Sequence, residues 1–167
     1  MKSRRNVLRN VLSGLGTLSA ALTGMRGLLS GTAAHAARTY ELMHSDEEWK
    51  KLLPPDAYRV LRKAGTERPY SSPLNKEKRA GVYSCAGCAL PLFSSSTKFE
   101  SGTGWPSFWQ PLDNAVVEET DTTLFIRRTE VLCRRCGGHL GHVFKDGPKP
   151  TGLRYCMNGA ALAFKVA

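Results

Sequence analysis

The sequence predicts an α+β domain that is mainly β, with short helices first and antiparallel sheets after them. Helix start and stop signals occur before residue 66. From residue 81 onward, short runs of β-branched and aromatic residues are separated by Gly, Pro and Asp, which is typical of strands and turns. A length of 167 residues fits one such domain after an N-terminal extension.

That extension, residues 1–36, is typical of an export signal. It contains five basic residues and no acidic one, and its twin arginines in "SRRNVL" precede a moderately apolar stretch. "AHA" at 34–36 has the small-x-small pattern of a cleavage site. We therefore expect a twin-arginine signal peptide over 1–36, a mature domain over 37–167 and a periplasmic location. An uncleaved membrane anchor is the alternative, although Gly, Ser, Thr and Arg26 interrupt the apolar stretch.

The distribution of charge argues against a nucleic-acid-binding protein. Half of the net charge of +10 lies in residues 1–36, so the remaining 131 residues are only mildly basic. They contain no dense block of lysine or arginine, which a polyanion-binding surface would need.

Two short helices are predicted at the start of the domain. Ser45 or Asp46 can cap the first helix, because acidic residues follow in its first turn. Pro54 can open the second helix and Gly65 can close it. The apolar positions expected to face the core are Leu53, Tyr58 and Leu61.

Residues 67–81 have the composition of a loop, and strands are predicted after them. The runs with strand composition are 81–85, 115–119, 123–133, 142–146, 153–158 and 161–166.

Two C-x2-C pairs, "CAGC" and "CRRC", have the spacing of a zinc site. Four thiolates satisfy a tetrahedral ion completely, so the site would be structural rather than catalytic. A disulfide within each pair or a redox-active pair are alternatives in an exported protein. Export of a folded chain favours zinc, which can be loaded before export. The predicted ligands are Cys85, Cys88, Cys133 and Cys136.

Cys156 is the fifth of five cysteines and has no partner left. On a strand, Arg154, Cys156 and Asn158 share one face, whereas Tyr155 and Met157 face the core. Arg154 would lower the pKa of the thiol, and Asn158 could bind water or a substrate oxygen. The alternative is that Cys156 is simply a small buried apolar residue.

In "GGHLGHVF", His139 and His142 are three positions apart, so they would point to opposite faces of a regular strand. A bulge at Gly141 would bring both into one pocket, where imidazoles are suited to proton transfer. A second metal site or plain surface histidines are the alternatives.

The stretch "SGTGWPSFWQPL", residues 101–112, combines aromatic residues with glycines. Trp105 and Phe108 are candidates for the lining of a small apolar substrate pocket. Core packing is the alternative, and for Phe108 it is the preferred one.

These stretches together resemble one family, the methionine-R-sulfoxide reductases of the MsrB type. The matching stretches are "SDEEWKKLLPPDAYRVLRKAGTERP", "GVYSCAGCALPLFSSSTKFESGTGWPSF", "RTEVLCRRCGGHLGHVFKDGPKPTGLRYCMN" and "AALAF". The resemblance implies two antiparallel sheets with small N-terminal helices and one structural Zn²⁺ held by the two C-x2-C pairs. It also implies oxidised methionine as substrate, with the preference between protein-bound and free forms left open, and a thioredoxin-like or other thiol as reductant.

The resemblance further implies a role for each candidate residue. Cys156 would attack the sulfoxide sulfur and become a sulfenic acid, and Arg154 would support its thiolate. Trp105 would receive the S-methyl group. The residues that would organise water and protonate the departing oxygen are His139, His142 and Asn158.

Two positions depart from the family pattern. Many members have a recycling cysteine where this chain has Thr103, and Gly159 stands where serine is usual. The alternatives from other classes are a zinc-ribbon-like module that binds nucleic acid or protein without catalysis, and a thiol–disulfide oxidoreductase that uses a C-x2-C pair.

Overall fold

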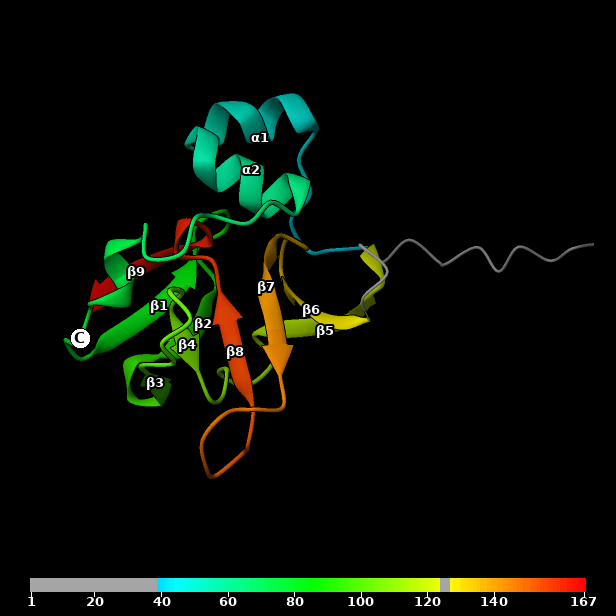
Figure 1. Cartoon of the computed structure of the whole chain (residues 1–167). Helices are drawn as coiled ribbons and strands as arrows, with labels where there is room; N and C mark the ends of the chain where they lie inside the picture. The colour runs from blue at the N-terminus through cyan, green and yellow to red at the C-terminus, as the bar shows by residue number, and fades with distance from the viewer. Residues whose placement is uncertain (1–38, 124–126) are drawn as a thin grey trace, which may run out of the picture. The chain divides into compact units, whose positions relative to one another are not determined.

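Two short helices precede the strands in the part of the chain that this computed structural model describes, residues 39–123 and 127–167 (Figure 1). The predicted signal peptide lies outside the described residues. Helix α1 spans Asp46–Leu52, and Ser45 caps it in a reciprocal capping box with Glu48. Helix α2 spans Pro55–Lys63 and ends at Ala64, a residue in the left-handed region with φ of 49°. The residue that ends the helix is therefore Ala64, one position before the predicted Gly65.

The described residues form two antiparallel sheets. The smaller has the strand order β2-β1-β9, with β1 at Gly81–Cys85, β2 at Pro91–Ser94 and β9 at Leu162–Val166. The larger has the order β3-β4-β8-β7-β6-β5. Its strands are β3 Lys98–Phe99, β4 Ser107–Phe108, β5 Val116–Asp121, β6 Arg128–Cys133, β7 His139–Phe144 and β8 Arg154–Met157. These sheets and helices confirm the predicted fold class.

Strands β2, β3 and β4 were not predicted. Strand β2 lies in the apolar stretch "PLFS", which is too short to show an alternating pattern. Strands β3 and β4 have two residues each, and they form by pairing, β3 with β4 and β4 with β8, rather than from a local sequence pattern. The remaining described segments include the short 3₁₀ turns η1 Pro73–Asn75, η2 Ser95–Thr97 and η4 Gly159–Ala161.

The core lies between the sheets and is rich in aromatic rings. Phe108 stacks on Phe93 with ring centroids 4.4 Å apart, and Tyr83 meets Phe108 edge-on at 4.9 Å. Tyr155 and Met157 are buried in this core, as the alternation of β8 predicts. The face of β8 that carries Cys156 is therefore turned away from the core.

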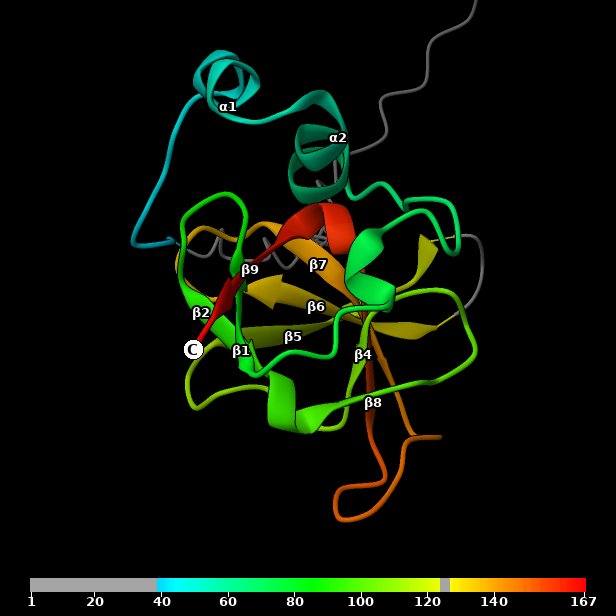
Figure 2. The same ribbon diagram turned by 90° about the vertical axis from the view of Figure 1, so that its left-hand side faces the viewer.

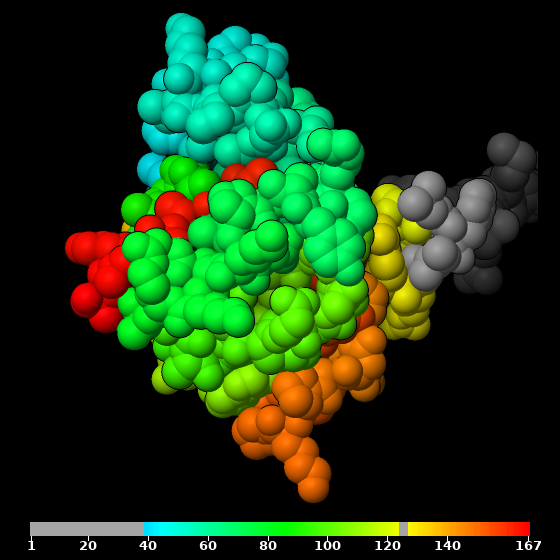
Figure 3. All heavy atoms as spheres, turned by 60° about the vertical axis from the view of Figure 1, so that its left-hand side comes forward, coloured from blue at the N-terminus to red at the C-terminus, as the bar shows by residue number. Residues whose placement is uncertain are grey.

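Helix α2 covers one end of the larger sheet. In Figure 2 it lies over the red η4 turn and beside β7, and its residues Val60 and Leu61 are buried there. At the other end, the orange loop between β7 and β8 projects from the body, as Figures 1 and 3 agree. All described residues belong to one compact unit, residues 37–167. No helix among them is long and apolar enough to cross a membrane.

Candidate functional site

The four paired cysteines come together at one point. Their sulfur atoms all lie within 4.8 Å of one another, with Cys85 3.7 Å from Cys136 and Cys88 3.4 Å from Cys133. A tetrahedral zinc ion with Zn–S bonds of 2.3 Å requires sulfur atoms about 3.8 Å apart. The cluster is thus a possible metal-binding site with the dimensions and donor set that zinc prefers. All five cysteines lie in the described residues and none forms a disulfide.

Each C-x2-C pair is part of the same tight turn. The N–H of Ala89 donates to the carbonyl of Cys85, and the N–H of Gly137 donates to the carbonyl of Cys133, both at 2.8 Å. Ala89 has φ of 58° and Gly137 has φ of 67°, so the residue after each pair is left-handed. In the first turn this left-handed residue is an alanine and not the glycine within the pair, Gly87.

The helices pack directly on the sulfur cluster. A side chain at Gly138 would collide with Leu61 of α2, so glycine at this position allows α2 to approach the second pair. Arg62 donates from Nη1 to the carbonyl of Cys136 at 3.0 Å. Trp49 of α1 approaches the first pair, since a Cβ at Gly87 would lie 3.6 Å from its ring. Both helices therefore pack against the cysteine turns.

Cys156 lies in β8, between strands β4 and β7. Its direct cross-strand neighbours are Ser107 on β4 and His142 on β7. Opposed residues in antiparallel strands place their side chains on the same face. The half-buried thiol is therefore flanked by a hydroxyl on one side and an imidazole on the other.

The surroundings of Cys156 favour the protonated form of its thiol over the thiolate. Burial raises the pKa of the Cys156 thiol, while the Thr103 hydroxyl and the positive charge of Arg154 act in the opposite direction. Arg154 lowers the pKa of the thiol as predicted, but burial outweighs its effect, so the net shift is upward and not downward. Arg154 gives two hydrogen bonds to Asp146, at 2.9 and 2.8 Å, and its guanidinium lies 4.4 Å from the centre of the Phe144 ring. Asp146 and the Phe144 ring thus hold the positive charge of Arg154, which reduces its effect on a Cys156 thiolate.

His139 and His142 face each other, with ring centroids 5.4 Å apart. The bulge that was predicted to allow this is present in β7. Val131 of β6 pairs with Gly141 and Leu132 pairs with His139, so Leu140 is the extra residue. A side chain at Gly141 would collide with the carbonyl oxygen of Cys156, so glycine here lets β7 and β8 pair closely.

Each histidine is held by a carboxylate. His139 Nδ1 lies 2.6 Å from Glu130 Oε1, and His142 Nε2 lies 2.8 Å from Asp121 Oδ2. An ionised carboxylate only accepts hydrogen bonds, so these ring nitrogens carry the protons. Burial lowers the pKa of His142, although Asp121 opposes this effect. The opposite nitrogen of His139, Nε2, is buried and has no hydrogen-bond partner among the described residues.

The backbone of a loop residue, Glu67, is hydrogen-bonded to both remaining candidates, Trp105 and Asn158. Its backbone carbonyl accepts from Nε1 of Trp105 at 3.2 Å, and its N–H donates to Oδ1 of Asn158 at 2.9 Å. Asn158 also donates from Nδ2 to the carbonyl of Leu140 at 3.1 Å. It lies just beyond β8 at the start of η4, where its amide connects three segments of the site.

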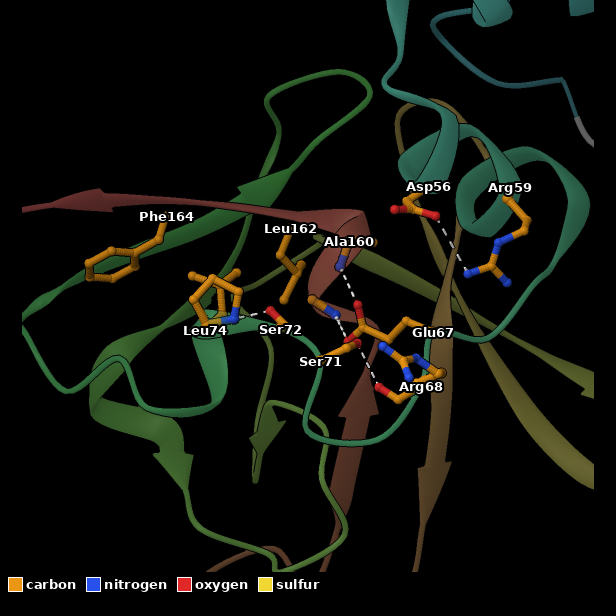
Figure 4. Close-up of a pocket in the computed structure, with 12 residues that line it drawn as sticks. Asp56, Arg59, Glu67, Arg68, Ser71, Ser72, Leu74, Ala160, Leu162 and Phe164 are labelled. Carbon is orange, nitrogen blue, oxygen red and sulfur yellow. Dashed lines mark hydrogen bonds and ion pairs between the residues drawn. The ribbon is translucent and has the colours of Figure 1, made fainter.

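The side chain of Glu67 is itself a clamp. Its carboxylate is 7% exposed and accepts hydrogen bonds from the N–H groups of Gly159 and Ala160, at 2.6 and 2.9 Å. Figure 4 shows it turned toward Ala160 in a groove of about 500 Å³. Sequence reasoning missed Glu67 because nothing in a polar loop indicates a partner more than 90 residues away. Asp121 and Glu130 were also missed, because they meet His142 and His139 only through strand pairing, at separations of 21 and 9 residues.

Glu67→Gln should lower the free energy of unfolding by about 2 kcal/mol, because one of two buried backbone donors would face an amide N–H group. Equilibrium denaturation in urea measures this. The matched control is Glu47→Gln, at an exposed position of α1, which should change stability by less than about 0.5 kcal/mol. Equal stability of the two variants would contradict the clamp.

Phe108 does not contribute to the site. It is fully buried in the aromatic core, on the opposite face of β4 from Ser107. The candidate role of Phe108 in substrate binding is therefore wrong, and its preferred interpretation as a core residue is confirmed. Trp105 is half-buried and connected to the site through Glu67, so it remains the candidate aromatic contact.

The chain is similar to known proteins over nearly all of the described region. The SelR domain matches residues 53–166. Proteins named peptide methionine sulfoxide reductase MsrB are similar in Leptospira interrogans (56% identical over 127 residues, 75% of this chain and 97% of the relative) and in Methanosarcina barkeri (59% over 122 residues, 72% and 86%). A protein of the same name in Pseudomonas putida is 58% identical over 120 residues, 71% of this chain and 90% of the relative. With matches of this extent over the sulfur cluster and Cys156, the chain belongs to the MsrB family.

Proposed function

We propose that this protein reduces the R epimer of methionine sulfoxide, in peptides and as the free amino acid, to methionine. The observation that carries the proposal is the position of Cys156. Its half-buried thiol lies opposite His142, whose imidazole meets that of His139, on a face of the sheet that points away from the core. Each imidazole is oriented by a carboxylate. The names of the relatives supply the substrate class.

In the first step, the sulfur of Cys156 forms a bond to the sulfoxide sulfur while the sulfoxide oxygen gains a proton. This S–S bond and the S–O bond of the substrate then break as the hydroxyl group passes to the Cys156 sulfur. The balanced outcome is methionine and a sulfenic acid on Cys156, so the cysteine is oxidised as the sulfoxide is reduced. The raised pKa of Cys156 and the lowered pKa of His142 favour a neutral thiol beside a neutral imidazole at rest. The thiol proton can then pass through a histidine to the departing oxygen, and no external acid is needed.

Trp105 and Arg154 have supporting roles in this proposal. The indole N–H of Trp105 is held by the carbonyl of Glu67, which fixes the ring so that it can receive the S-methyl group. The charge of Arg154 favours the thiolate as it forms, and Asn158 holds the chain after Cys156 in place.

Regeneration of Cys156 requires an external thiol. Thr103 Oγ1 lies 3.8 Å from the sulfur of Cys156, and a hydroxyl cannot form a disulfide with a sulfenic acid. The other four cysteines form the sulfur cluster. A thioredoxin-like protein or a small thiol would therefore attack the oxidised Cys156 directly.

The sulfur cluster is proposed to hold one structural Zn²⁺. Four thiolates would fill its coordination sphere, so the metal supplies folding energy and leaves no position for substrate. The non-catalytic binding module and the C-x2-C oxidoreductase are both disfavoured, because neither gives a role to Cys156 or to the histidines.

The decisive test is an assay of the two sulfoxide epimers separately, with a dithiol reductant. We expect turnover of the R epimer alone, because one fixed site places the methyl, the oxygen and the lone pair in one arrangement relative to Cys156. The same assay with Trp105→Ala compares the turnover of each epimer with and without the ring proposed to receive the S-methyl group. Equal turnover of the S epimer would overturn the proposal.

We also propose that residues 1–36 direct export to the periplasm by the twin-arginine route. Replacing Arg4 and Arg5 together with lysine should leave an unprocessed precursor in the cytoplasm, because the route reads the arginine pair as an address. Cell fractionation and immunoblotting measure this. Processed protein in the periplasm of the double variant would contradict the proposed route.

A further inference from the structure

Three hydroxyl groups form a continuous hydrogen-bonded chain that ends at the sulfur of Cys156. Thr103 Oγ1 lies 3.8 Å from this sulfur and 2.8 Å from Ser101 Oγ. Ser101 Oγ lies 2.7 Å from Ser107 Oγ, which donates to the carbonyl of Trp105 at 3.1 Å. Ser107 is 1% exposed, so the inner end of this chain is shielded from water.

The carbonyl at the inner end fixes the direction of the chain. A carbonyl only accepts, so the single proton of Ser107 is committed to Trp105. Ser101 must then donate to Ser107, and Thr103 must donate to Ser101. With its proton used in this way, Thr103 can only accept from the Cys156 thiol. At rest each hydroxyl in the chain donates once, and Ser101 accepts both from the Thr103 hydroxyl and from the backbone N–H of Thr103.

Ionisation of Cys156 reverses one link of this chain. When the thiol proton leaves to water, Thr103 can rotate its O–H toward the thiolate, giving up its bond to Ser101. Ser101 Oγ keeps an acceptor bond from the backbone N–H of Thr103, at 3.5 Å. A hydrogen bond to a charged group is roughly twice as strong as a neutral one, so the exchange favours the thiolate.

We propose that Thr103 is a catalytic hydroxyl that accepts a hydrogen bond from the Cys156 thiol at rest and donates one to its thiolate on ionisation, with Ser101 and Ser107 as positioning residues. Its relevance to turnover rests on the proposed function, but the hydrogen bonding itself does not. The charged or titratable groups that also face Cys156 are His142 on β7 and Arg154 on β8, with Asp146 on Arg154.

The test is the pH dependence of Cys156 alkylation by iodoacetamide in the metal-loaded protein, followed by mass spectrometry. Thr103→Val removes the hydroxyl but keeps the shape, and should move the midpoint up by about one pH unit, which is roughly tenfold less thiolate at neutral pH. Thr103→Ser retains the hydroxyl and should keep the wild-type midpoint. A Thr103→Val profile that coincides with the wild type would overturn the proposal.

Ser101→Ala tests the direction of the chain. Loss of the Ser101 acceptor frees the Thr103 proton for the thiolate, so the midpoint should fall rather than rise. A rise would show that Ser101 donates toward Thr103, and would overturn the proposed direction. Because Thr103→Ala removes the same hydroxyl, it provides a second reading if Thr103→Val does not fold. Alkylation needs no sulfoxide, so the hydroxyl chain can stand even if neither epimer is reduced.

Discussion

Cys133→Ser is expected to release the metal and remove most of the free energy of unfolding. Cys85 is the last residue of β1 in the smaller sheet, and Cys133 is the last residue of β6 in the larger one. An ion in the sulfur cluster would therefore join the two sheets and support the helices that pack on the cysteine turns. Metal-binding energy in such sites is folding energy, on the order of 10 kcal/mol in small zinc domains.

Two measurements check this expectation: the metal-to-protein ratio and the thermal unfolding midpoint. The wild type should contain about one zinc ion per chain, and Cys133→Ser should contain none and unfold at a much lower temperature. Cys156→Ser is the matched control, since it removes a half-buried cysteine outside the cluster and should keep both metal and stability. A metal-free Cys133→Ser protein that melts normally would contradict the structural role.

The features that sequence predicted well are those with short-range causes. The capping box at Ser45 and Glu48 is complete within four residues. The alternation of β8 correctly assigned Tyr155 and Met157 to the core. The paired cysteines also carry a local signal, because a C-x2-C turn places both sulfur atoms on one side whatever the rest of the chain does.

The features that could not be predicted depend on segments that meet only in the fold. Asp121 reaches His142 because β5, β6 and β7 are neighbours, and Glu67 reaches Gly159 across the groove. The pKa of Cys156 shows the same limit in energetic terms. The neighbouring Arg154 suggested a low value, but burial depends on three-dimensional packing and outweighs that charge.

Cys156→Ser is expected to abolish sulfoxide reduction, by at least about a thousandfold in kcat/KM, because a serine hydroxyl is a far weaker nucleophile toward sulfur. The overall structure should be preserved, since the substitution changes one atom on a half-buried face of β8. Steady-state assays with the R epimer measure the loss. Circular dichroism and zinc content establish that the variant is folded. Activity that survives in a folded variant would mean that the nucleophile is another residue.

The role of Cys156 as nucleophile can also be tested directly, by trapping the oxidised form that one turnover should leave. One equivalent of the R sulfoxide, added without reductant, should leave a sulfenic acid that dimedone traps on Cys156 and on no other cysteine. This outcome is expected because the group beside the sulfur is the hydroxyl of Thr103, and because the four remaining thiols are committed to the cluster. Peptide mapping by mass spectrometry locates the adduct. A disulfide between Cys156 and any cluster cysteine, with metal released, would show instead that the cluster takes part in turnover.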